Sequence, residues 1–143
     1  MQILNLSYNH LSSFEQPLTV LPWQTLSLLD LDLSSNMLQE SLLIPPLSTI
    51  FFLASKNNLT RRIPSMICMV NSLEILDISD NQLIGEIPQY LGNFSSSLSI
   101  LNLKRNLFQG NLPETFMEGS ILTSLDFSYN QIQGKIPRSL VKC

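Results

Sequence analysis

The chain has 143 residues, of which 44% are hydrophobic and 13% charged, and its formal net charge is −3. This length and composition suit one folded domain with a sizeable core and argue against disorder. The scattered basic residues and a sequence pI of about 4.9 provide no charged footprint for nucleic acid. Apolar runs such as residues 50–54 are far shorter than the roughly 20 residues that span a bilayer, so we expect no membrane contact from this segment.

One pattern recurs along the whole chain. It reads Leu-x-x-Leu-x-Leu-Ser-x-Asn-x-Leu, and its asparagine falls, in chain order, at Asn9, Asn36, Asn57, Asn81, Asn106 and Asn130. The steps between these asparagines are 27, 21, 24, 25 and 24 residues, within or close to the roughly 20 to 29 residues of leucine-rich repeats. We therefore predict one leucine-rich-repeat domain of about six repeats over residues 1–143.

Each repeat is expected to begin with a short strand. Five and three residues before each asparagine the side chains are apolar, as at Leu76 and Ile78. Residues two apart lie on one face of a strand, so these side chains should face the core and the intervening ones should point outward. Strands stacked about 4.8 Å apart would give an α/β-type solenoid, a right-handed coil with a parallel sheet on its concave face.

The asparagine itself has a predicted mechanical role. Its side-chain amide carries donors and an acceptor, and can therefore satisfy backbone groups where the chain turns inward after the strand. The six asparagines of the pattern are expected to form a structural ladder along the solenoid.

A second signature follows the asparagine in the later repeats. A glycine is followed three residues later by proline, beginning at Gly85, Gly110 and Gly134. Glycine permits a tight turn and proline cannot donate to a ladder, so we expect the chain to leave the strand here. The second repeat has Glu40 in place of this glycine, and its coil is expected to be irregular.

The return segments should lie on the convex face. Residues 89–93, 114–119 and 138–142 are short and partly apolar, which suits a helical turn or a 3-10 stretch. Leu91, Phe116 and Leu140 occupy one column of these segments and should face inward.

These residues together resemble the plant-specific class of extracellular leucine-rich repeats, whose pattern is LxxLxxLxLSxNxLxGxIPxxLxx. Residues 73–143 fit it best, and residues 45–47, 63–68 and 85–94 are similar to the ectodomains of plant receptor-like proteins of the leaf-mould resistance family. The resemblance implies a receptor-like protein at the extracellular face of the plasma membrane, acting in defence or developmental signalling. It also implies a protein or peptide ligand and a possible co-receptor kinase, while a receptor kinase would use the same repeat.

The ends of the chain depart from this family. Met1 falls inside a repeat, no signal peptide or anchor is recognisable, and neither end carries a cysteine-paired cap. Solenoids normally need polar caps at both ends, so we expect a fragment or a truncated product. A secreted inhibitor of cell-wall-degrading hydrolases, which uses the same repeat, is an alternative hypothesis, and so is a truncated product without a function of its own.

Ligand recognition is expected on the outward strand positions and the column beside them. Four residues before the asparagines runs a polar, partly acidic row, and Lys104 interrupts a column of serines next to Arg105. Aromatic and arginine anchors dominate protein recognition. The candidate ligand-binding residues are Asp32, Leu53, Asp77, Asn102, Lys104, Arg105, Asp126 and Tyr129.

We expect neither catalysis nor a metal or cofactor. The acidic residues of the candidate set lie on alternate strands, roughly 10 Å apart, and nothing suggests a pocket that would raise one pKa as a carboxylate pair requires. His10 is the sole histidine, which disfavours nucleophile–base catalysis and a multi-histidine zinc site.

The chain carries three acceptor sequences for N-glycosylation, beginning at Asn5, Asn58 and Asn93. Asn58 and Asn93 are expected in turn or convex positions, whereas a glycan on Asn5 would cover part of the concave face. Cys68 and Cys143 fall three coils apart, roughly 14 Å at the strand spacing, so we expect buried free thiols rather than a mutual disulfide.

Overall fold

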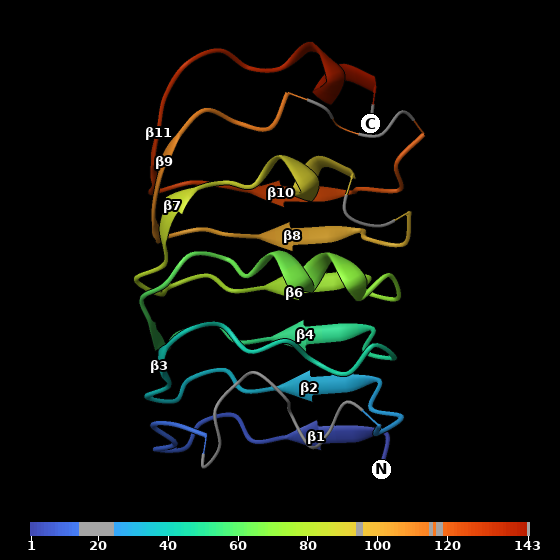
Figure 1. Cartoon of the computed structure of the whole chain (residues 1–143), viewed down its shortest axis with the longest axis vertical. Coiled ribbons are helices and arrows are strands. Elements are labelled where there is room, and N and C mark those ends of the chain that lie inside the picture. Colours follow the sequence, from blue (N-terminus) through green and yellow to red (C-terminus); the bar gives the residue numbers. More distant parts are fainter. Residues whose placement is uncertain (15–24, 94–95, 115, 117–118, 143) are drawn as a thin grey trace.

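Six short parallel strands form the main sheet of the protein. The structure, a computed structural model, describes residues 1–14, 25–93, 96–114, 116 and 119–142. The strands of the main sheet are β1 (Ile3–Asn5), β2 (Asp30–Asp32), β4 (Phe51–Leu53), β6 (Ile75–Asp77), β8 (Ile100–Asn102) and β10 (Ser124–Asp126). They lie side by side in chain order, stacked as the rungs in Figure 1. The fold is a parallel β-solenoid, which confirms the predicted class.

The register of the main sheet is constant from end to end. The apolar residues five positions before the asparagines are direct partners across the strands, in the order Leu4, Leu31, Phe52, Leu76, Leu101 and Leu125. The four inner residues of this row are at most 1% exposed, whereas the two end residues are only partly buried. The reason is that an end coil is covered by a neighbour on one side only. The residues between the inward ones point to the opposite side, called here the open face.

Sharp turns end all six strands. The residue just before the ladder asparagine has a positive φ, between 50° and 57°, in every coil: Tyr8, Ser35, Lys56, Asp80, Arg105 and Tyr129. None of them is glycine, although the left-handed conformation costs other residues about 1–2 kcal/mol. Sequence reasoning missed this feature because these six side chains share no chemistry.

A second set of strands lies beyond the turns and corrects the prediction that the chain leaves the sheet there. β7 (Ile84–Glu86), β9 (Leu107–Gly110) and β11 (Gln131–Ile132) form one parallel sheet, and β3 (Gln39–Glu40) pairs with β5 (Asn58–Leu59). Gly85 and Gly110 have φ values of 91° and 82° yet lie within these strands. Stacking brings the same segment of successive coils within pairing distance, so the chain forms a second ladder at the left margin of Figure 1.

Two features favour glycine at these two positions: the positive φ and the side chains of the preceding coil. A Cβ atom on Gly110 would lie 2.9 Å from Cγ of Glu86, and one on Gly85 would lie 2.9 Å from Cγ of Arg62. Each glycine therefore leaves room for the side chain that follows the corresponding position in the coil before it.

We expect Gly110→Ala to lower the free energy of unfolding by about 2 kcal/mol, because positive φ strain adds to this crowding. Gly119 provides a matched control, since its φ is 76° and a Cβ there would meet nothing within 4 Å. Urea denaturation should show a clearly smaller loss for Gly119→Ala. Equal losses for the two variants would contradict a role for the crowding.

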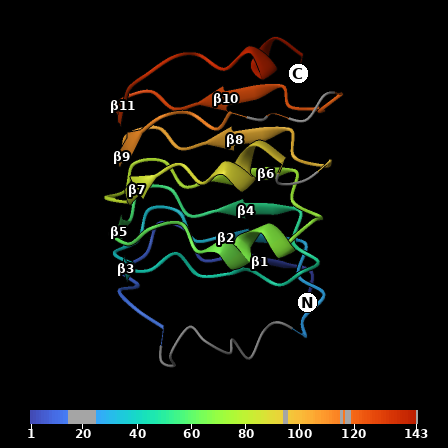
Figure 2. The same cartoon turned by 45° about the horizontal axis from the view of Figure 1, so that its top comes forward.

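Three 3-10 turns lie in the return segments: η1 (Ser65–Met69), η2 (Gln89–Asn93) and η3 (Arg138–Lys142). The turns predicted at residues 89–93 and 138–142 are confirmed, while residues 115, 117 and 118 of the third predicted segment lie outside the described residues. Leu91 and Phe116 are buried as expected, at 1% and 6% exposure. Figures 1 and 2 both show η1 and η2 crossing the same side of the main sheet.

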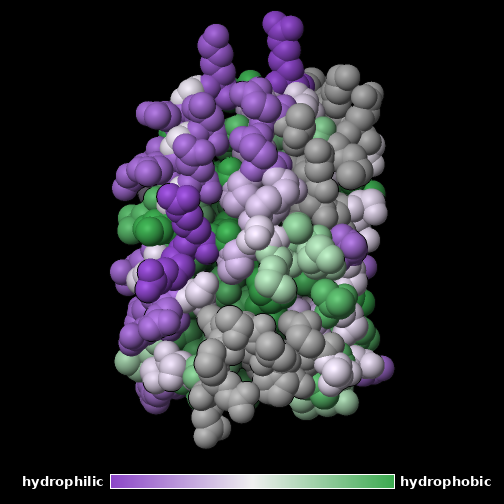
Figure 3. All heavy atoms as spheres, viewed as in Figure 1, coloured by the Kyte–Doolittle hydropathy of each residue, from purple (hydrophilic) through white to green (hydrophobic). Residues whose placement is uncertain are grey.

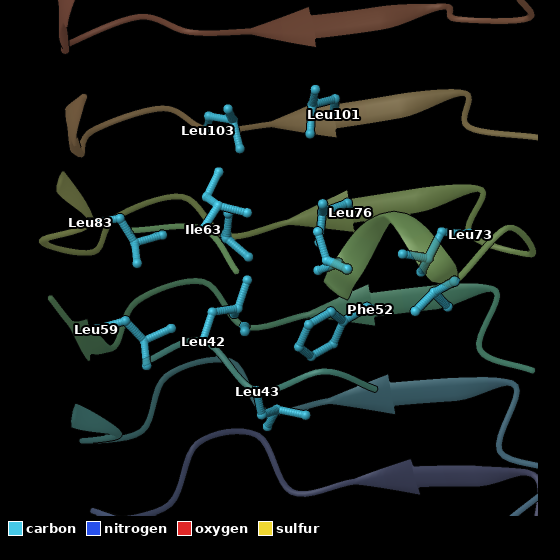
Figure 4. Packing of buried hydrophobic residues seen from close by; sticks show 14 of the residues in the cluster. Leu42, Leu43, Phe52, Leu59, Ile63, Leu73, Leu76, Leu83, Leu101 and Leu103 are labelled. Carbon is cyan, nitrogen blue, oxygen red and sulfur yellow. The ribbon is translucent and has the colours of Figure 1, made fainter. Parts of the chain in front are cut away.

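The core lies between the main sheet and these return segments. Figure 4 shows Phe52, Leu76 and Leu101 on successive strands, with Leu73 packed beside them from the approach to β6. Leu59 and Leu83 extend the same cluster toward the second sheet. Within the described part of the chain, no helix is long and apolar enough to cross a membrane.

Candidate recognition surface

The ladder asparagines join each coil to the preceding one. Nδ2 of Asn81 donates to the carbonyl oxygens of Ile78 and Ser79 in its own coil, at 3.2 and 3.0 Å. It also donates to the carbonyl of Ala54 in the preceding coil, at 3.0 Å, while Oδ1 accepts the N–H of Leu59 at 3.1 Å. Both the amide nitrogen and the amide oxygen of Asn81 are therefore hydrogen-bonded, and the side chain is buried.

The same four-bond arrangement is present at Asn36, Asn57, Asn106 and Asn130. Asn9, in the first coil, is exposed, and its partners among the described residues are the carbonyl oxygens of Leu6 and Ser7. These contacts support the left-handed residue that precedes each asparagine. The ladder is therefore a structural element rather than part of a binding face.

The acidic row on the open face also has a structural task. Oδ1 of Asp77 accepts the N–H of Ser79 at 3.0 Å. The same bond is made to the residue two positions on by Asn5, Asp32, Asn102 and Asp126. Such local bonds hold the backbone in a turn. Sequence reasoning missed this role, although the spacing of Asp or Asn two residues before Ser carries the signal.

This backbone hydrogen bond is accepted by one oxygen of each aspartate carboxylate, Oδ1, and does not involve the second oxygen. The hydroxyl and N–H of Ser128, together with the charge of Lys104, hold the pKa of Asp126 below its usual value. The three aspartates of the row, Asp32, Asp77 and Asp126, give the open face a negative column. Leu53 is the one residue of this column without a polar side chain.

Four candidate and flanking side chains come together near the ends of β6, β8 and β10. The guanidinium carbon of Arg105 lies 5.0 Å from the centre of the Tyr129 ring, and Nζ of Lys104 lies 5.6 Å from it. Both distances allow cation–π attraction. Arg105 also approaches Oδ1 of Asp80 at 3.5 Å. We call Asp80, Lys104, Arg105 and Tyr129 the basic–aromatic cluster.

The side chains of the basic–aromatic cluster are exposed to solvent, and they contact one another without a ligand. Tyr129 is 70% exposed, and the side chain of Arg105 is 55% exposed. An exposed ion pair of this kind contributes little to stability. The cluster arises because left-handed residues of successive coils occupy the same place, so side chains distant in sequence become neighbours.

Not all candidate ligand-binding residues belong to one group. Asn102 and Asp126 lie on β8 and β10 beside the cluster, whereas Asp32 lies on β2, three strands away from β8. Leu53 and Asp77 lie on β4 and β6 between these groups. The open face is therefore long, and its two ends present different chemistry.

An apolar stripe on the open face was not predicted from sequence. Phe51, Ile75 and Ile100 are direct partners on three neighbouring strands, six residues before their asparagines. Phe51 is 37% exposed, and the other two are partly exposed. We call these three residues the apolar stripe. Their signal in the sequence was a further apolar column, which the inward columns next to it obscured.

The glycosylation candidates have distinct settings. Asn5 ends β1 and is exposed, but its Oδ1 accepts both the N–H and the hydroxyl of Ser7, at 2.9 and 2.7 Å. Asn58 is exposed and begins β5, so the expectation of a turn or convex position is wrong: it lies in the second set of strands. The side chain of Asn93 and the rest of its acceptor sequence lie outside the described residues.

Cys68 is free and partly buried in η1, and Cys143 lies outside the described residues. No group of three or more His, Cys, Asp or Glu side chains suited to a metal ion occurs among the described residues.

Shallow grooves follow the second sheet. One of about 470 Å³ is bordered by Arg62, Glu86, Tyr90 and Gln109, and Gln109 also borders the two grooves next to it. Figure 3 shows hydrophilic side chains predominating over this margin of the molecule. The second sheet is thus a polar flank, separate from the basic–aromatic cluster.

Comparisons with known proteins agree with this architecture. The family model described as Leucine Rich Repeat matches residues 72–94 and 122–143. Receptor-like protein 53 of Arabidopsis thaliana is 47% identical over 96 residues, which are 67% of this chain and 10% of that protein.

Solved structures show the same fold. The ectodomain of the Arabidopsis receptor kinase HAESA, in complex with the peptide hormone IDA and the co-receptor SERK1, matches 100% of this chain and 24% of its own with a TM-score of 0.81 and 30% identity. The leucine-rich-repeat ectodomain of GASSHO1/SCHENGEN3 from Arabidopsis thaliana, in complex with CASPARIAN STRIP INTEGRITY FACTOR 2, covers 99% of this chain and 20% of its own. Its TM-score is 0.81 at 27% identity.

The repeat, the fold and these matches define a leucine-rich-repeat solenoid of the plant extracellular type. Within that class the chain belongs to the plant receptor-like proteins. It spans about a tenth of the length of receptor-like protein 53.

Proposed function

We propose that this solenoid segment recognises a protein or peptide ligand through the open face of its main sheet, without a catalytic step. The segment would serve a receptor-like protein at the extracellular face of the plasma membrane, with signalling passed on through a separate co-receptor kinase. Support comes from two solved neighbours: the HAESA ectodomain holds the peptide hormone IDA and the co-receptor SERK1, and the GASSHO1/SCHENGEN3 ectodomain holds CASPARIAN STRIP INTEGRITY FACTOR 2.

The observation that carries this proposal is the basic–aromatic cluster. Arginine and tyrosine are the residues that most often dominate binding energy at protein interfaces. Here Arg105 and Tyr129 are exposed yet held against each other, so a ligand would not have to order them on binding. Asp80 and Asp126 beside the two cations provide both signs of charge for discriminating between ligands.

We expect Arg105→Ala to weaken binding of open-face peptides about tenfold, equivalent to about 1.4 kcal/mol. Peptides would be selected from a displayed random library on the immobilised full chain, and their affinities measured by calorimetry. Arg61→Ala is the matched control, because Arg61 is also an exposed arginine but lies next to β5 of the second set of strands.

The control variant should bind as the wild type does. Failure to select any peptide, or affinities that fall with Arg61→Ala and not with Arg105→Ala, would contradict recognition by the open face. Thermal unfolding of each variant, followed by circular dichroism, would show that the lost affinity does not reflect lost structure.

A further inference from the structure

The apolar stripe has a negative column as its neighbour on the open face. Ile75 and Asp77 are two residues apart on β6 and point to the same side, which separates them by about 7 Å along the strand. The stripe spans β4, β6 and β8, and so extends over two strand spacings, about 10 Å. On these strands the column beside the stripe reads Leu53, Asp77 and Asn102, so an apolar edge runs parallel to an edge with one carboxylate at its centre.

Asp77 is the carboxylate of this column that lies on a strand of the apolar stripe, and no ion pair to it occurs among the described residues. Its partners on the neighbouring strands are Leu53 and Asn102. Asp126, by contrast, is influenced by the charge of Lys104, and Asp80 contacts Arg105. Since Oδ1 of Asp77 already accepts a backbone N–H, the second oxygen remains for a positive group of a ligand.

From this arrangement, and resting on the proposed function, we infer that the ligand is an extended peptide in which apolar and basic residues alternate. Side chains of an extended chain point alternately to opposite edges. A peptide lying between the two columns would place its apolar residues on Phe51, Ile75 and Ile100 and a lysine or arginine at Asp77.

Binding of three short synthetic peptides to the full chain tests this inference. One alternates leucine and lysine, one has the same composition in two blocks, and one alternates leucine and glutamate. We expect the first to bind about tenfold more tightly than either of the others, as measured by calorimetry.

Two substitutions copy residues that the same columns already contain. Asp77→Asn keeps the backbone bond, because Asn102 makes it with its Oδ1 at 3.1 Å. Ile75→Ser copies Ser124, its counterpart on β10. Each should weaken the alternating leucine–lysine peptide about tenfold. Glu86→Gln is the control and should leave the affinity unchanged, because Glu86 is an exposed carboxylate on β7 of the second sheet.

The inference is overturned if the leucine–lysine peptide binds no better than the other two, or if Asp77→Asn and Ile75→Ser leave its affinity unchanged. Library peptides that respond to Arg105→Ala but not to these two substitutions would overturn the inference and leave the proposed function standing. Library peptides that respond to none of the three would defeat the proposed function itself.

Discussion

Replacing Asn81 by alanine is expected to lower the free energy of unfolding by about 2–4 kcal/mol. The substitution leaves the buried N–H of Leu59 without its acceptor, and it removes the bond to Ser79 that supports the left-handed turn at Asp80. The carbonyl oxygens of Ala54 and Ile78 keep a second donor, from Asn57 and Asn106, so they add less. Urea denaturation of the full chain measures the loss.

Asn9→Ala is the matched control for this ladder position. Asn9 is exposed, and both of its bonds stay within its own coil, so we expect a loss below about 0.5 kcal/mol. Hydrogen exchange should also separate the variants, because Asn81 links the coils of β4 and β6 and Asn9 links none. Equal destabilisation by the two substitutions would show that the contacts between coils do not stabilise the solenoid.

Phe52→Ala should have a comparable or larger effect, about 3–5 kcal/mol. Phe52 is 0% exposed at the centre of the inward row, where the other five strands carry leucine. Removing the ring leaves a cavity in the core. We expect the neighbouring coils not to fill it, because their own strand pairing holds them in place. Phe52→Leu is the graded control and should cost about 1 kcal/mol. A loss for Phe52→Ala no larger than that would show that the coil collapses to fill the space.

We expect the small size of Ala54 to make room for the phenylalanine at position 52. Ala54 is 1% exposed and lies two residues after Phe52 on the same side, where other coils carry leucine, isoleucine or phenylalanine. Ala54→Leu alone should overpack the core by about 1–3 kcal/mol. The double substitution Phe52→Leu with Ala54→Leu restores the common pattern, and we expect its loss to be smaller than the sum of the two single losses. A loss for the double variant equal to the sum of the two single losses would show that the volumes of residues 52 and 54 do not compensate each other.

The sequence predicts which residues of the candidate surface point outward, but not which of their side chains lie next to each other. The outward positions of Asp32, Asp77 and Asp126 follow from period-two alternation, because a strand exposes every second residue. The approach of Lys104 and Arg105 to Tyr129 depends on the turn of each coil and on side-chain direction across coils, which no local pattern encodes. The capping role of the aspartates was visible as a spacing and was overlooked.

The repeat by itself determined the solenoid, the six strands of the main sheet, the inward columns and the places of the ladder asparagines. These features are local or periodic, and burial of one face imposes them on every coil alike. Only the tertiary structure decided that residues after the turn pair again, that Gly110 must leave room for Glu86, and that Phe51, Ile75 and Ile100 form one exposed stripe. Each of these depends on the distance and register between neighbouring coils, which is set when the coils pack against each other.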